Sequence, residues 1–175
     1  SYRNDITGKE MLRAIRPEAE VEIDGKSYRI GGVKGQFEYA YLRQDWLGQF
    51  SGDPDAFQLT DFSINDIRPR FPWKPSRWTT NKQWPPKGKE VIFYFKAPAA
   101  KLPGITVTIH YEMYDGLPLM SKWISVQNES GRDIRVNTFK NEILAIVEEE
   151  SVVGGDGKLR TPHINVQSDY SFGDM

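Results

Sequence analysis

An alternation of apolar and polar side chains over residues 105–114 constrains the fold of this chain more than any other feature of its sequence. One set of alternate positions holds Ile105, Val107, Ile109, Tyr111 and Met113, and the other holds Thr106, Thr108, His110, Glu112 and Tyr114. Successive side chains of a β-strand point to opposite faces, so this period of two predicts a strand with one buried face and one wetter face. A second β-rich run follows at 119–126 after a turn at 116–118, and the pair indicates antiparallel sheets.

Further strands are expected on both sides of this pair. Residues 19–30 predict a hairpin, because alternating apolar residues flank Asp24 and Gly25, a dipeptide that favours tight hairpin turns. Apolar residues in phase predict strands at 36–42, 90–96 and 134–139, while 57–67 fits a short strand or a turn of helix and 141–149 fits a strand better than a helix. Thr7 and Glu10 form a capping-box pattern that predicts a short N-terminal helix over 8–15. The expected fold is all-β, an antiparallel β-sandwich with this one short helix.

The size and charge of the chain narrow the functional classes. Its 175 residues suffice for one domain with a sizeable core, so we expect a single domain over 1–175. The net charge of −1 and the absence of a basic patch argue against nucleic-acid binding. There is no cysteine, which excludes disulfides and Cys-ligated zinc, and no apolar run approaches the length of a membrane span. The chain begins without Met and ends abruptly, so we expect it to be a piece of a longer protein.

Motifs of common catalytic and cofactor sites are absent from the sequence. It contains no P-loop, no dinucleotide-binding glycine motif, no H-E-x-x-H and no G-x-S-x-G, so we expect no cofactor, no metal and no catalytic residue. His110 and Glu112 share one strand face, where a partly exposed cross-strand role is a better interpretation than a zinc site. Paired carboxylates hydrolyse glycosides, but among 24 acidic residues the sequence alone selects no pair.

A long irregular segment at 71–86 carries the best candidate site. It is interrupted by prolines and holds Trp73, Trp78 and Trp84, which argue against disorder. Aromatic rings stack on the C–H faces of sugars while neighbouring polar groups bind the hydroxyls, and we therefore expect sugar-binding residues at Trp73, Arg77, Trp78 and Trp84. The alternative is that these tryptophans only cover a sheet or a neighbouring domain.

The segment 109–131 resembles a known family. Its motif Tyr-x-x-Tyr-Asp-Gly-x-Pro-x-x-x-Lys-Trp, from Tyr111 to Trp123, and the following Asn-Glu-Ser-Gly at 128–131 are similar to the amino-terminal domain of family 36-like glycoside hydrolases, the α-galactosidase group. The resemblance implies a β-supersandwich of the galactose-mutarotase-like fold, placed before a (β/α)8 barrel that carries the catalytic aspartates. It thus implies a non-catalytic accessory domain of a carbohydrate-active enzyme.

The same resemblance implies the partners and the compartment. The domain would pack on the catalytic barrel of the same parent chain, help to shape its site for carbohydrate, and support a homo-oligomer. A bacterial protein of this kind would be periplasmic or secreted, with a cytoplasmic location left open. Two other hypotheses remain at this point: an independent carbohydrate-binding module, and a mutarotase-like sugar epimerase that uses His110 or His163 with a glutamate.

Overall fold

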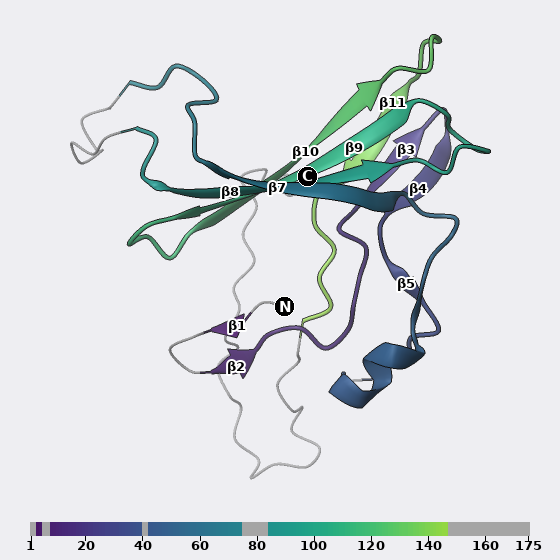
Figure 1. The fold of residues 1–175 in the computed structure, drawn as a ribbon, viewed down its shortest axis with the longest axis horizontal. Coiled ribbons are helices and arrows are strands. Elements are labelled where there is room, and N and C mark those ends of the chain that lie inside the picture. Colours follow the sequence, from purple (N-terminus) through teal and green to yellow (C-terminus); the bar gives the residue numbers. More distant parts are fainter. Residues whose placement is uncertain (1–2, 5–7, 40–41, 75–83, 147–175) are drawn as a thin grey trace, which may run out of the picture.

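The computed structural model describes residues 3–4, 8–39, 42–74 and 84–146, and their regular structure is almost entirely antiparallel β (Figure 1). The short strands are β1 (Arg3–Asn4), β2 (Lys9–Glu10), β5 (Val33–Lys34) and β6 (Ser51–Gly52). The longer strands are β3 (Ala19–Ile23), β4 (Lys26–Ile30), β7 (Gln58–Asp66), β8 (Gly88–Lys96), β9 (Ile105–Tyr114), β10 (Met120–Asn128) and β11 (Val136–Lys140). The expectation of an all-β fold is therefore confirmed.

Two sheets organise the molecule. The larger has the strand order β10-β9-β8-β7, and the smaller has the order β11-β3-β4, so that β11 returns from late in the chain to pair with β3. Two-residue pairs, β1 with β2 and β5 with β6, complete the described sheets. Neighbouring strands in the large sheet follow one another in sequence, and each pair is antiparallel.

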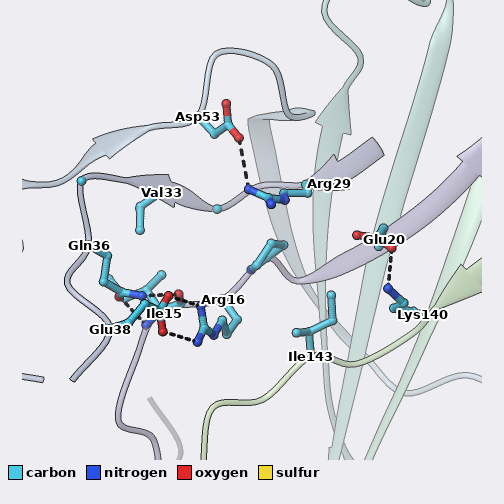
Figure 2. A pocket seen from close by; sticks show the side chains of 13 residues that line it. Ile15, Arg16, Glu20, Arg29, Val33, Gln36, Glu38, Asp53, Lys140 and Ile143 are labelled. Carbon is cyan, nitrogen blue, oxygen red and sulfur yellow. Dashed lines mark hydrogen bonds and ion pairs between the residues drawn. The ribbon is translucent and has the colours of Figure 1, made fainter. Parts of the chain in front are cut away.

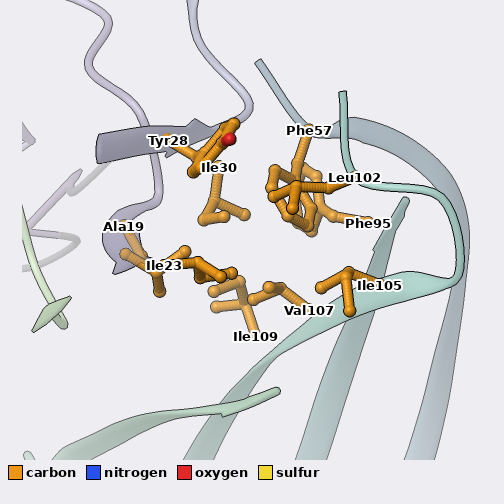
Figure 3. Packing of buried hydrophobic residues seen from close by; sticks show 11 residues of the cluster. Ala19, Ile23, Tyr28, Ile30, Phe57, Phe95, Leu102, Ile105, Val107 and Ile109 are labelled. Carbon is orange, nitrogen blue, oxygen red and sulfur yellow. The ribbon is translucent and has the colours of Figure 1, made fainter. Parts of the chain in front are cut away.

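The apolar alternation of β9 builds the core between these two sheets. Ile105, Val107 and Ile109 are at most 2% exposed, and they pack with the inward-facing residues of the small sheet (Figure 3). The remaining members of the cluster are Ala19, Val21, Ile23, Tyr28, Ile30, Phe57, Phe95 and Leu102. Each fully buried aliphatic side chain contributes about 1.5–3 kcal/mol to folding, so this cluster is the main stabilising element.

The β3–β4 hairpin forms where turn chemistry predicts it. Asp24 and Gly25 both have positive φ angles, 51° and 76°, which fits the two-residue turn that matches strand twist. The Asp24 carboxylate accepts hydrogen bonds from the Arg135 backbone N–H (2.8 Å) and from Arg132 (2.8 Å). These contacts hold the pKa of Asp24 below its ordinary value and tie the hairpin turn to the start of β11.

Two local predictions are wrong. Residues 8–15 contain β2 and a bridge from Leu12 to Ile146 instead of a helix, because a segment this short gains too little from helix formation to compete with pairing to distant backbone. No strand forms in the described part of 36–42, and the nearest is β5. The short helix lies later, as a 3-10 helix η1 (Gln44–Gln49), and within 141–146 the only strand-like feature is the bridge at Ile146.

Candidate functional site

An aromatic cluster lies at both ends of the long β7–β8 connection, where the sequence predicts a sugar-contacting surface. The rings of Trp73 and Trp84 are 5.3 Å apart, and the ring of Phe71 is 5.5 Å from that of Trp84. Trp73 and Trp84 are half-buried, whereas Phe71 is 50% exposed. The cluster therefore combines a packed interior with an aromatic ring open to a partner or ligand.

Arg70 connects this cluster to the outer face of the large sheet, the face turned away from the core. Its Nη2 lies 3.0 Å from the Glu112 carboxylate, and its guanidinium carbon lies 3.8 Å from the centre of the Trp123 ring. Charge-assisted bonding to a buried carboxylate and a cation–π contact each stabilise one arginine orientation. Because Arg70 precedes Phe71 directly, these contacts fix the start of the aromatic segment against β9 and β10.

Glu112 is the buried centre of the polar network on this face. It is 2% exposed and accepts a second hydrogen bond from the Tyr114 hydroxyl at 2.6 Å. Since Tyr114 donates its only proton to Glu112, the Ser121 hydroxyl, 2.9 Å away, donates to Tyr114. Burial first, and then the bond to Glu112, raise the pKa of Tyr114 above its ordinary value.

The alternation of buried and exposed side chains along β9 is reversed near the end of the strand. Glu112 and Tyr114 are buried although they belong to the wetter face, and Met113 is 65% exposed although it belongs to the apolar face. Arg70 covers the outer face here, and within the described residues the small sheet does not cover the apolar face at this point. The expectation of one uniformly buried face is therefore wrong at residues 112–114.

A second polar group lies beside this network. The Nδ1 of His110 is 3.0 Å from the Glu90 carboxylate, its ring stacks on Trp123 with centres 4.7 Å apart, and its Nε2 is 3.5 Å from the Ser125 hydroxyl. Glu90 and Trp123 reach His110 from the strands on either side of β9. Trp123 therefore joins the His110 pair to the Arg70 pair in one continuous surface.

The family-like motif also stabilises the opposite face of the sheet. The Lys122 side chain is 5% exposed; its Nζ donates to the Glu18 backbone carbonyl and lies 3.0 Å from the Glu142 carboxylate. The Tyr111 hydroxyl donates to the Glu18 carboxylate. Motif residues therefore form two networks, one on each face, and both hold neighbouring segments against β9 and β10. At the turn, Gly116 has the positive φ of 70° that its place in the motif suggests.

The structure brings together part of the predicted site. Trp73 and Trp84 are in contact as members of one cluster, while Arg77 and Trp78 lie outside the described residues, as does His163. Sequence reasoning missed Arg70 and the partnership of His110 with Glu90. Both depend on strand register and on the path of a loop, and the only available signal was the placement of His110 and Glu112 on the wetter face.

The carboxylates of this surface are engaged by neighbouring side chains. Glu112 is fully engaged by Arg70 and Tyr114, and Glu90 is hydrogen-bonded directly to His110, so no pair of free carboxylates faces a ligand among these residues. Within the described residues, no group of three metal-ligating side chains occurs, and no helix has the length and apolar character of a membrane span. Rings and exposed hydrogen-bonding groups are the available binding elements.

Comparison of the chain with models of protein families, with curated proteins and with solved structures gives no match. The described residues form an all-β fold whose large sheet carries aromatic and polar side chains on its outer face.

Proposed function

We propose that this chain is a non-catalytic accessory domain of a carbohydrate-active enzyme resembling α-galactosidases, and that its aromatic cluster helps to shape the sugar site. The observation that carries the proposal is the contact of Trp73 and Trp84 beside Arg70, which is held on Glu112 and Trp123. Sugar sites commonly combine aromatic surface with a few oriented polar groups. A catalytic barrel of the same parent chain supplies the aspartates in this proposal.

Titration of the chain with galactose and methyl α-galactoside, followed by tryptophan fluorescence, separates this role from that of an independent binding module. An accessory domain shares its sugar contacts with a catalytic partner, so we expect no saturation below about 50 mM. Millimolar saturation that is lost in Trp73→Ala and retained in Phe139→Ala, an exposed aromatic of β11, would instead establish the module. Release of galactose by the chain alone would contradict both roles.

A mutarotase-like sugar epimerase is the second candidate, because His110 and Glu90 form a hydrogen-bonded pair on the outer face. Interconversion of sugar anomers needs an acid and a base at the ring and exocyclic oxygens. Polarimetry of freshly dissolved α-galactose tests this function directly. A rate above that of buffer, lost in His110→Ala, would support it, and a rate equal to buffer would eliminate it.

A further inference from the structure

A pocket of about 400 Å³ lies over the outer face of the small sheet (Figure 2). Its floor is the cross-strand row formed by Arg29 of β4, Glu20 of β3 and Lys140 of β11, which are neighbours in the strand register. The remaining lining comes from the segment before β3, the residues around β5, Asp53 directly after β6, and Ile143 after β11.

The walls of this pocket are held in place by contacts between distant segments. The Gln36 side chain accepts a hydrogen bond from the Ile15 backbone N–H (2.7 Å) and donates to the Ile15 carbonyl (3.1 Å). Arg16 donates two parallel hydrogen bonds of 2.8 Å to the Glu38 carboxylate. A ligand entering the pocket therefore meets walls that are already ordered, which lowers the entropic cost of binding.

Most charges that line the pocket are neutralised at hydrogen-bond distance. Arg16 is paired with Glu38, and Lys140 lies 2.6 Å from the Glu20 carboxylate. Asp53 is 6% exposed and is bound by Lys34 at 3.0 Å. The backbone N–H of Asp55 and the Lys34 ammonium lower the pKa of Asp53 despite its burial, which acts most strongly in the opposite direction.

Arg29 is the exception. Its side chain is 60% exposed, and its nearest carboxylate in the described part of the chain is that of Asp53, at 3.7 Å, beyond hydrogen-bond length. Asp53 and Asp55 are already shared with Lys34 and Lys101, so three cations face two carboxylates in this network. Arg29 therefore shares its nearest carboxylate with another cation, and its planar donors suit a further carboxylate.

We propose that this pocket binds a sugar acid, a monosaccharide-sized molecule with one carboxylate, and that Arg29 is its anchor. The lining includes the apolar side chains of Ile15, Val33 and Ile143, which can contact the C–H groups of a sugar. The ion pairs on the floor and wall retain donors and acceptors for the hydroxyls. The site is separate from the aromatic cluster and does not depend on the function proposed for it.

The test is calorimetric titration of the whole chain with D-galacturonate, and with D-galactose as the uncharged counterpart. We expect saturable binding of galacturonate below about 50 mM and at least about tenfold weaker binding of galactose. Arg29→Gln should weaken galacturonate binding about tenfold or more. The affinity of Arg29→Lys should lie between those of the parent and of Arg29→Gln, because lysine keeps the charge without the planar pair of donors.

The matched control is Arg135→Gln, which removes a charge from an exposed arginine outside the pocket and should leave binding unchanged. Trp73→Ala should also leave it unchanged, which distinguishes this site from the aromatic cluster. Equal affinity for galactose and galacturonate, unaltered binding in Arg29→Gln, or no binding of galacturonate at about 50 mM would each overturn the proposal.

Discussion

The carboxylate of Glu112 lies between two donors, the Arg70 guanidinium at 3.0 Å and the Tyr114 hydroxyl at 2.6 Å, with only 2% of the residue exposed. A buried acceptor with two donors is costly to remove, because each donor loses its partner. Arg70 can partly return to water, since 37% of its side chain is exposed, but Tyr114 cannot. The stability of the site therefore depends strongly on this one side chain.

Glu112→Ala should lower the free energy of unfolding by about 2–3 kcal/mol, as urea denaturation would measure. Glu112→Gln should cost less, because an amide oxygen still accepts the Tyr114 hydrogen bond. Glu129→Ala, at an exposed turn position, is the control and should change stability by less than about 0.5 kcal/mol. A loss in Glu112→Ala no greater than in the control would show that the network is not stabilising.

Tyr114 should also be visible in a pH titration. Burial and the bond to Glu112 raise its pKa, so the folded protein favours the neutral phenol more than the unfolded chain does. This contribution to stability is complete below the unfolded pKa near 10 and is lost as pH rises through the raised folded value. Absorbance at 295 nm should show a tyrosine ionisation shifted to higher pH, and Tyr114→Phe should remove it. A titration curve unaltered by the substitution would contradict this assignment.

At the scale of elements, the first residue of β8 must be small, because the backbone there approaches β9 closely. A Cβ added to Gly88 would lie 2.0 Å from the Met113 carbonyl oxygen and 2.8 Å from the Ile67 side chain. Only glycine fits where another backbone approaches this closely. Because Trp84 lies just before this position, the paired end of β8 also locates one half of the aromatic cluster.

Gly88→Ala should therefore lower the free energy of unfolding by about 3 kcal/mol, since the backbone must move to admit a methyl group. Gly48→Ala is the matched control, because nothing lies within 4 Å of the added Cβ there. Thermal denaturation of both variants provides the comparison. Equal melting temperatures for the two variants would contradict the close approach of β8 to β9.

The predicted elements have a signal in adjacent residues, whereas the missed ones depend on partners that are far apart in the sequence. The β3–β4 hairpin and the β9 strand were predictable, because period-two alternation and an Asp-Gly turn are properties of adjacent residues. The pairing of Arg70 with Glu112 joins residues 42 positions apart, and the bridge from Leu12 to Ile146 spans most of the chain. Local patterns carry no information about such partners. This explains both the wrong helix at 8–15 and the missed contact of Arg70 with the Trp123 ring.

At the scale of the whole molecule, the small sheet covers only part of the large one. Ile109 of β9 is fully buried, whereas Phe62 and Ile64 of the edge strand β7 are 58% and 61% exposed although their register places them on the same face. The core of this chain is therefore centred on β3, β4 and β9. The apolar side chains of β7 contribute little to the stability of the described fold.

Ile109→Ala should cost about 2–5 kcal/mol, because it leaves a cavity in the core. Ile64→Ala removes the same atoms from a mostly exposed position and should cost less than about 0.5 kcal/mol. Urea denaturation of the two variants measures the difference. Similar losses in both would place the core elsewhere.

The proposed accessory role places this chain in a longer α-galactosidase-like enzyme, and its most direct test is the galactosidase kinetics of that enzyme with Trp73 and Trp84 replaced singly by alanine. Loss of an aromatic sugar contact should raise KM about three- to tenfold with kcat changed less than about twofold, while Phe139→Ala leaves both unchanged. A KM that stays at its original value in both tryptophan variants, each folded as stably as the parent, would contradict a sugar-contacting role for the cluster.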